Sequence, residues 1–316
     1  MSNLFSIWSN FYPYLSVHYS QHYLKSCYEK QHLPEPTANS YKNGYPFCYY
    51  LQHGKMFYLQ AEQAPYELRP ILLFYGMVQL LKAWLLTADV DYPKQTSVLA
   101  HGVSSRKIKK YGYAFFDDAV RIQKTGLFSH LAKLMFHMKP LEGKKYCMGH
   151  LLKNIPELNG LFKRMKKTTI CYPLIPIENN QYMLPINSLD KLHMTEEKLS
   201  QQLKQYDIPF QCLSEKGFFI LNFKEGLTPI SAGPFQYSLS GEYMMPNRKE
   251  KADLPEILIH YLILYNLSMI SRYETEWWYD LHYQKASPDL TFIHAFLDVT
   301  ANKIPFYICK YLEEII

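Results

Sequence analysis

The sequence predicts an α+β fold, with a mainly helical body in which N- and C-terminal helices pack together and a β-rich insert. Two patterns lead to this prediction. Apolar residues recur with helical spacing over much of 1–165 and 251–316. Between them, in a β-rich lobe at 166–250, short apolar runs alternate with turn residues. Because 48% of the 316 residues are hydrophobic and 20% are charged, a wholly disordered chain is excluded.

The N-terminal portion is expected to begin with a helix at 15–31, which Pro34 and Pro36 end before a polar loop at 39–44. The aromatic-rich segment 45–60 follows, and His53 and Gly54 separate its two apolar runs. Two runs of this kind around a turn residue predict a small β-hairpin.

Residues 69–86 are apolar on nearly every face, which predicts a central buried helix. Tyr75, Gln79 and Lys82 follow one another at i, i+4 and i+7, so they form a polar line along this helix. The simpler interpretation is that the line faces water, and the alternative is a functional role. Gly76 is interpreted as a point where a neighbouring element comes close.

Residues 89–126 are predicted to be rich in loops, and a helical period returns at 127–138. One helix, near 195–206, is expected to interrupt the β-rich lobe. In the C-terminal portion, Pro305 is expected to kink or interrupt the last helix, because proline removes a backbone hydrogen bond from a helix interior.

Charge and cysteine usage predict a cytoplasmic protein with a mild preference for anionic partners. The formal charge of +6 falls short of the strongly basic footprint of a dedicated nucleic-acid domain. The six cysteines are isolated from one another, which favours reduced thiols, and the N-terminus does not resemble a signal peptide. Apolar stretches at 70–88 and 254–270 contain polar or charged residues, so we expect buried helices and no membrane association.

The segment HGVSSRKIKK at 101–110 combines hydroxyl groups with Arg and Lys, and Gly102 allows a close backbone approach. Hydroxyls and backbone N–H groups donate to phosphate while Arg and Lys neutralise its charge, so this composition suits a phosphate-bearing ligand. The alternative is a solvated basic turn. The candidate binding residues of the segment are His101, Ser104, Arg106 and Lys107.

The segment SRYETEWW at 271–278 ends an apolar helix. If the helix continues, Arg272 and Glu276 form an i, i+4 ion pair, and the alternative makes Arg272 a ligand clamp. His18 and His22 share a helical face, but no third ligand is near them in the sequence, so no metal site is predicted. P-loop, Rossmann and hydrolase-elbow motifs do not occur, and we therefore predict no cofactor and assign no catalytic residue.

Four segments carry a family resemblance: RPILLFYGMVQLLKAWLL (69–86), LAHGVSSRKIKK (99–110), RIQKTGLF (121–128) and SRYETEWW (271–278). Through them the chain resembles the YaaC-like family of Bacillus and relatives over nearly its whole length. Members of that family are often encoded beside the IMP dehydrogenase gene. The resemblance therefore implies a link to guanine-nucleotide metabolism, as a partner or regulator.

The helical motifs more distantly resemble the HEPN group, in which some members are ribonucleases that use an Arg and a His a few residues apart. Here eight residues separate Arg121 from His130, and nine separate Arg272 from His282, so the sequence departs from that pattern. The resemblance is compatible with a HEPN-like scaffold without catalysis.

Together these observations predict a non-enzymatic binding or regulatory protein that acts on IMP dehydrogenase or on a phosphate-bearing ligand. The alternatives are an RNA-binding or HEPN-like ribonuclease-type protein, which would use the basic runs at 106–110 and 163–167, and a structural partner of a larger assembly. The predicted binding residues are Arg69, Lys82, His101, Ser104, Arg106, Lys107 and Arg272.

Overall fold

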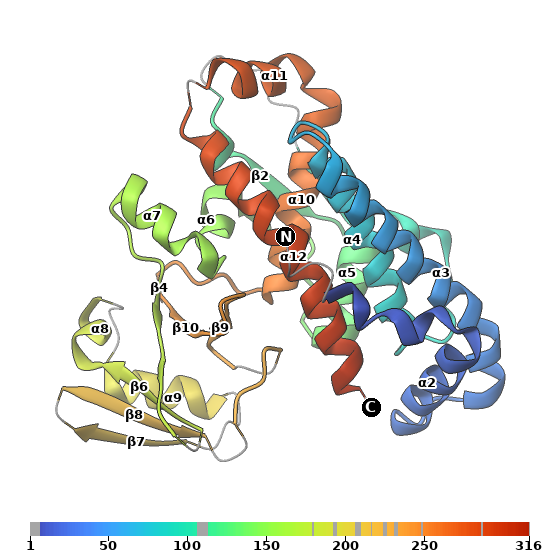
Figure 1. Cartoon of the computed structure of the whole chain (residues 1–316), viewed down its shortest axis with the longest axis horizontal. Helices are drawn as coiled ribbons and strands as arrows, with labels where there is room; N and C mark the ends of the chain where they lie inside the picture. The colour runs from blue at the N-terminus through green and yellow to red at the C-terminus, as the bar shows by residue number, and fades with distance from the viewer. Residues whose placement is uncertain are drawn as a thin grey trace. The chain divides into compact units, whose positions relative to one another are not determined.

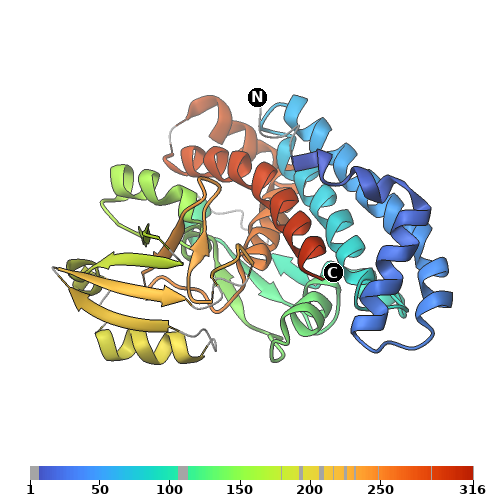
Figure 2. The same ribbon diagram turned by 60° about the horizontal axis from the view of Figure 1, so that its bottom comes forward.

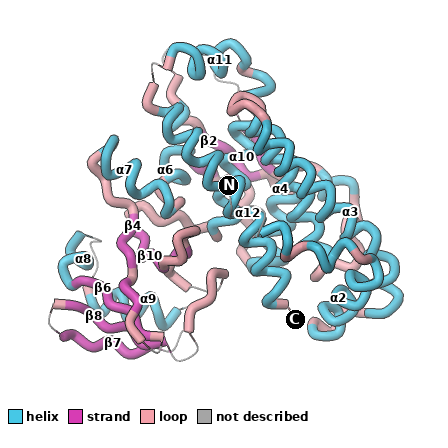
Figure 3. The backbone as a smooth tube through the Cα atoms, viewed as in Figure 1, coloured by secondary structure: helices cyan, strands magenta, loops and turns pink. Residues whose placement is uncertain are grey.

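The chain folds into two compact units, Met1–Gly149 with Ile257–Ile316, and His150–Glu256. The computed structural model describes residues 7–105, 113–178, 180–191, 195–205, 210–215, 217–223, 226–230, 233–247, 249–285 and 287–315. The first unit is mainly helical, and the second holds most of the strands (Figure 3). The predicted α+β class with a helical body is therefore confirmed. The β-rich unit begins at His150 and ends at Glu256, whereas the sequence pattern placed its limits at 166 and 250.

Helices from both ends of the chain build the first unit. The long helix α4 packs against α3 and α12, and α2 packs against α3 (Figure 1). The hydroxyl of Tyr23 in α2 donates a 2.8 Å hydrogen bond to the carbonyl of Leu312 in α12, which joins the two ends of the chain. The α-helices are α2 (Val17–Lys30), α3 (Pro36–Gln63), α4 (Arg69–Leu86), α5 (Leu127–Phe136), α10 (Glu256–Tyr273), α11 (Thr275–Gln284) and α12 (Asp289–Glu314).

Helix α4 is the central buried helix that the sequence predicts. Leu73, Phe74 and Met77 on it are fully buried. Within the part of the chain that the structure describes, α4 is also the one helix long and apolar enough to cross a membrane, and 67% of that window is buried inside the protein. A core helix of this composition passes the same length and hydropathy criteria.

The predicted hairpin at 45–60 and the predicted loop at 39–44 are both wrong, because α3 runs without interruption through the two segments. Tyrosine and phenylalanine favour strands, but packing against α4 overrides that preference. Gly54 is not a turn residue. A Cβ atom there would lie 2.7 Å from Leu80 Cδ2, so this glycine lets α3 and α4 approach closely.

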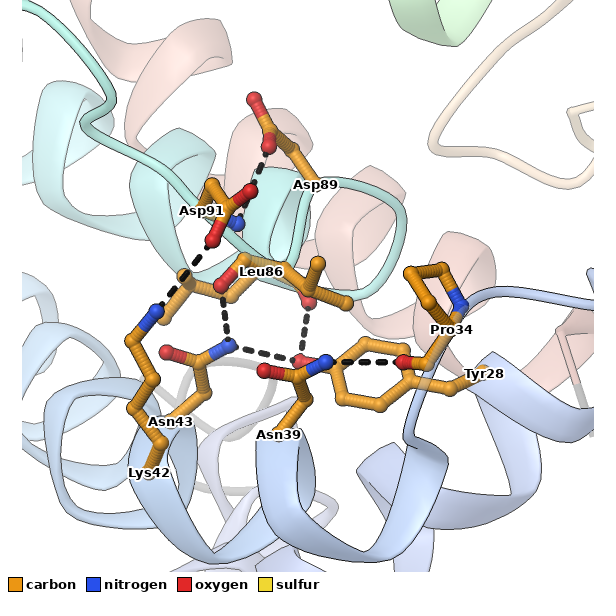
Figure 4. A network of polar contacts seen from close by, with 9 residues as sticks. Tyr28, Pro34, Asn39, Lys42, Asn43, Leu86, Asp89 and Asp91 are labelled. Atoms are coloured by element: carbon orange, nitrogen blue, oxygen red, sulfur yellow. Dashed lines mark hydrogen bonds and ion pairs between the residues drawn. The ribbon is translucent and has the colours of Figure 1, made fainter.

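Polar residues of segment 39–44, which was predicted to be a loop, form hydrogen bonds between α3 and neighbouring segments (Figure 4). Asn43 Nδ2 donates to the Tyr28 hydroxyl (3.1 Å) and to the Val90 carbonyl (2.9 Å). The Tyr28 hydroxyl in turn donates to the Leu86 carbonyl at the end of α4 (2.8 Å). Asn39 Nδ2 donates to the Pro34 carbonyl (2.8 Å). The bonds of Tyr28 and Asn43 fix the C-terminal end of α4.

A small antiparallel sheet lies in the first unit, partly in the stretch predicted to be rich in loops. It has the order β1-β2-β3, and Ser104 pairs with Arg121. Strands of three or four residues are too short to produce a clear alternating pattern, so the sequence does not reveal them. Their bounds are β1 (Val103–Ser105), β2 (Ala119–Ile122) and β3 (Lys145–Cys147).

One expectation for the C-terminal portion is wrong, and of the kink or interruption expected at Pro305 the interruption does not occur. Helix α10 ends at Tyr273 and α11 begins at Thr275, so Arg272 and Glu276 lie on different helices and the i, i+4 geometry is lost. Helix α12 continues through Pro305, which is buried, so the helix is not interrupted there. The apolar packing of α12 compensates for the backbone hydrogen bond that proline removes.

The second unit holds two antiparallel sheets with the orders β4-β10-β9 and β5-β6-β8-β7. Leu199 and Leu203 of α9 are buried in one cluster with Leu221 of β8 and Met245 of β10, and Figure 2 shows α9 along the larger sheet. The elements are α6 (Met148–Leu152), α7 (Asn159–Lys166), β4 (Cys171–Pro173), β5 (Ile175–Pro176), β6 (Gln181–Pro185), α8 (Ile186–Lys191), α9 (Glu196–Gln205), β7 (Phe210–Glu215), β8 (Phe218–Phe223), β9 (Gln236–Tyr237) and β10 (Tyr243–Pro246).

Candidate functional site

Three of the predicted binding residues lie in the first unit and are linked electrostatically through His101: Lys82 of α4, His101 before β1, and Arg272 at the end of α10. The charges of Arg272 and Lys82 both act on the His101 imidazole, and no carboxylate is among the described groups that shift its pKa. All three side chains are partly exposed. We call these three residues the cationic site.

Arg272 is held by neutral oxygens. Its Nε donates to the Ser268 carbonyl (2.9 Å), and its Nη1 donates to the Tyr75 hydroxyl (3.2 Å). The centre of its guanidinium lies 5.8 Å from the Tyr75 ring centroid. In the described chain no carboxylate bonds to Arg272, so its charge is oriented without being neutralised.

Lys82 lies on the same face of α4 as Tyr75. Seven residues at 1.5 Å rise place their Cα atoms about 10 Å apart along the helix. The Lys82 Nζ atom is 5.6 Å from the Tyr50 ring centroid, and burial lowers its pKa. The described residues offer it no hydrogen bond or ion pair. Tyr75, Gln79 and Lys82, which form the polar line that the sequence predicts, are all partly exposed, so the line keeps part of its surface in water.

The backbone around His101 is locked in place by two glycines. Gly102 has φ = +76° and Gly126 has φ = +127°, and a Cβ atom on Gly126 would lie 2.4 Å from Gly102 Cα. Only glycine permits this contact. The carbonyl of His101 also accepts hydrogen bonds from the Tyr261 hydroxyl (2.9 Å) and from the backbone N–H of Phe128 (3.2 Å). The close backbone approach at Gly102 is to Gly126, and an approach to a phosphate there stays a prediction.

The imidazole of His101 lies edge-on against aromatic rings. Its centroid is 4.9 Å from that of Phe74, 5.9 Å from that of Tyr265 and 6.1 Å from that of Tyr75. Burial lowers the pKa of His101, and the charges of Arg272 and Lys82 lower it further. Its Nδ1 atom is buried and has no hydrogen-bond partner among the described residues. The ring is therefore neutral near pH 7.

This arrangement is suited to an anion. A guanidinium, an ammonium and an imidazole can each donate hydrogen bonds to phosphate oxygens, and charge-assisted bonds of this kind are the stronger ones. A negative charge placed among them would also favour the protonated imidazole, because an opposite charge nearby raises the pKa of a base.

The other predicted residues lie elsewhere. Arg69 forms a 2.9 Å ion pair with Asp298 of α12, and its guanidinium lies 4.1 Å from the Tyr66 ring. The Ser104 hydroxyl in β1 accepts a 2.6 Å hydrogen bond from Gln123 Nε2. Neither contacts the cationic site. Arg106 and Lys107 lie outside the described residues.

The site includes residues that the sequence did not single out as ligands. Tyr75 positions Arg272, and Tyr265 and Tyr50 line the site. The signal for Tyr75 was present, because it shares the polar line with Lys82. Tyr265 and Tyr50 gave no such signal, because a chain with 28 tyrosines does not reveal which ones border a site.

The histidines considered for metal binding or RNA cleavage contact a neighbouring histidine, a backbone carbonyl or a carboxylate. The rings of His18 and His22 are 4.2 Å apart, and His22 Nδ1 lies 2.9 Å from the His18 carbonyl oxygen. His130 Nε2 lies 2.8 Å from Asp89 Oδ2, and His282 Nδ1 lies 3.9 Å from Glu67 Oε1. In the described ranges, no group of three or more His, Cys, Asp or Glu side chains is arranged to hold a metal ion.

Comparison with known protein families shows to which family the chain belongs. The profile of the family described as YaaC-like Protein matches residues 12–312. The chain belongs to the YaaC-like family. The resemblance seen in its sequence is thereby confirmed, and the match spans both units of this YaaC-like chain and all three residues of the cationic site. The more distant HEPN-like resemblance stays a prediction. The chain has no match among the curated proteins or the solved structures.

Proposed function

We propose that this YaaC-like protein is a non-enzymatic binding or regulatory protein that binds a phosphate-bearing ligand at the cationic site. One observation carries the proposal: the charges of Lys82 and Arg272 both act on the partly buried His101, and no carboxylate is among the described groups that shift the His101 pKa. A charge that is partly removed from water without a partner is costly, and an anionic ligand offsets that cost.

The surroundings favour binding over catalysis. The described groups that shift the His101 pKa are both cations, so the imidazole has no carboxylate to orient it as a general base. The guanidinium is instead oriented in advance by Ser268 and Tyr75, which reduces the entropy lost when a ligand binds. A positively charged site with an oriented guanidinium and without an acid–base pair among the described residues fits recognition of an anion.

The test is isothermal titration of the full chain with pyrophosphate and with GMP. We expect binding of both by the wild type, and affinities lower by at least about tenfold in Lys82→Gln and in Arg272→Gln, because each loses a charge-assisted hydrogen bond. Lys42→Gln is the matched control, since Lys42 is an exposed lysine of α3 that pairs with Asp91. If neither probe binds, or if both site variants bind like Lys42→Gln, the proposed function is wrong.

The family resemblance supports a second step in this proposal, in which the ligand-bound protein acts on IMP dehydrogenase as a partner in guanine-nucleotide metabolism. Affinity purification from the native host, read by mass spectrometry, tests it. We expect IMP dehydrogenase to co-purify with the wild type, and less of it with Arg272→Gln and Arg106→Ala. Equal recovery with all three proteins, or no recovery, would contradict this step.

RNA binding is the second candidate function, and helix α7 favours it. Lys163 and Arg164 on this short helix are exposed. Salt separates the two candidates, because binding to a nucleic-acid backbone releases counterions and weakens steeply as salt rises. RNA affinity that falls by orders of magnitude between about 50 and 200 mM salt, and that is unaffected by Arg272→Gln, would favour RNA binding outside the cationic site.

A further inference from the structure

A row of aromatic rings adjoins the cationic site. His53 and Phe57 of α3 have ring centroids 4.8 Å apart, and the centroids of Phe57 and Tyr75 of α4 are 6.2 Å apart with an interplanar angle of 29°. Tyr75 accepts a hydrogen bond from Arg272, so the row ends beside the cationic site. His53 is exposed, and Phe57 and Tyr75 are partly exposed. We call His53, Phe57 and Tyr75 the aromatic row.

The close crossing of α3 and α4 produces this row. A Cβ atom on Gly76 would lie 2.9 Å from Phe57 Cβ and 2.8 Å from Tyr58 Cδ2, so the two backbones meet where Gly76 has no side chain. The helices lie side by side in Figure 1. Tyr58 occupies the buried side of the crossing and is 3% exposed, which leaves Phe57 on its outer side beside Tyr75.

Helix packing alone accounts poorly for the exposure of these rings. The neighbouring rings of Tyr58 and Phe74 are buried, at 3% and 0% exposure. The rings of the aromatic row keep part of their surface in water, beside cations that lack a carboxylate. Exposed aromatic faces stack on planar rings, and arginine adjacent to such faces is typical of sites for base-bearing phosphates.

We infer that the phosphate-bearing ligand also carries a planar aromatic ring, which stacks on the aromatic row while its phosphate meets Lys82, His101 and Arg272. This inference rests on the proposed function and names the ligand class, a nucleoside monophosphate. The chemistry is shared by a nucleotide unit of single-stranded RNA. We commit to the free nucleotide because the row holds three rings and the Cα atoms of Tyr75 and Lys82 are about 10 Å apart along α4, which suits one base and its phosphate rather than a strand.

The experiment compares the affinities of AMP, GMP, ribose 5-phosphate and a single-stranded RNA ten nucleotides long for the full chain, by isothermal titration at one salt concentration. We expect AMP and GMP to bind about tenfold more tightly than ribose 5-phosphate, because stacking of one base contributes about that factor or more. We expect the RNA to bind no more tightly per molecule than AMP.

Two variants test whether the aromatic ring of the ligand stacks on the aromatic row. Phe57→Leu keeps an apolar side chain but removes the stacking face, so it should bring the affinities for AMP and ribose 5-phosphate close together and leave that for ribose 5-phosphate unchanged. Tyr49→Leu is the matched control: Tyr49 is a tyrosine of the same helix that is 59% exposed, and it is not one of the rings of the row. It should keep the wild-type preference for AMP. Circular dichroism and melting temperature confirm that both variants fold.

Each contrary outcome has a distinct meaning. If ribose 5-phosphate binds as tightly as AMP and Arg272→Gln weakens both, the ring inference is wrong and the proposed function stands. An RNA that binds more than tenfold more tightly than AMP overturns the assignment to a free nucleotide. If none of the four probes binds, both the inference and the proposed function fail. A wild-type AMP preference in Phe57→Leu overturns the placement of the ring.

Discussion

The substitution Gly76→Ala tests the close crossing of α3 and α4 on which the site depends. The new Cβ atom would lie 2.8 Å from Tyr58 Cδ2 and 2.9 Å from Phe57 Cβ, and the second of these atoms is attached directly to the backbone of α3. Relief therefore requires the helices to move apart, and overpacking of this kind costs about 1–3 kcal/mol. Alanine returns about 1 kcal/mol of helix propensity. From the middle of that range of costs, we expect a net loss of about 1 kcal/mol.

Thermal unfolding of the first unit, followed by tryptophan fluorescence, measures this loss of stability. All four tryptophans lie in the first unit, so their emission reports on its unfolding. For a unit of this size the melting temperature should fall by about 2–4 °C per kcal/mol. Gly160→Ala in α7 is the matched control, followed by amide hydrogen exchange because it lies in the second unit. Nothing lies within 4 Å of its added Cβ, so it should be neutral or stabilising. The reasoning is refuted if Gly76→Ala is as stable as the wild type.

Three further predictions concern stability. Burial, and next the charge of His282, lower the pKa of His294 from 6.5 to about 4. Between these pH values the unfolded chain binds more protons than the folded one, so the free energy of unfolding of the first unit should decrease as pH falls from 6.5 to 4. This decrease should be smaller in His294→Phe. Tyr28→Phe removes a hydroxyl that bonds both the Leu86 carbonyl and Asn43, and should lower the free energy of unfolding by about 1–3 kcal/mol in urea titrations. Asn154→Ala breaks bonds to the backbone at His150, Glu250 and Ala252, and should speed amide exchange throughout the second unit at least about tenfold, whereas unchanged exchange would contradict its role.

The sequence predicted those parts of the fold that local pattern determines. Helix α4 is apolar on nearly every face, so its existence and its central position follow from composition. Helix α3 could not be predicted in the same way, because its tyrosines and its two glycines at 44 and 54 favour other structures locally. Its helical form depends on Gly54 meeting Leu80 and on Asn43 bonding Tyr28, and both are contacts with other helices.

The candidate site, too, could be predicted only in part from local sequence patterns. Lys82, His101 and Arg272 were predicted singly, from the polar line of a helix, from a basic segment and from the end of an apolar helix. Their convergence depends on tertiary structure, because the Gly102–Gly126 contact and the Tyr261 hydrogen bond place His101 beside α10. Arg69 carries the same charge as Lys82 and is the first residue of the same helix α4, yet it pairs with Asp298. No sequence pattern separates an arginine that a carboxylate neutralises from one that stays available.

The titration of His101 tests the anion site most directly. Proton NMR of the histidine ring signals, assigned with His101→Gln and recorded from pH 5 to 8, gives its pKa with and without saturating pyrophosphate. The account predicts a pKa below the ordinary 6.5 in the free protein, because of burial and of the charges of Arg272 and Lys82, and a clear rise when pyrophosphate binds. A pKa of His101 that pyrophosphate leaves unchanged at saturation would contradict binding of the anion among Lys82, His101 and Arg272.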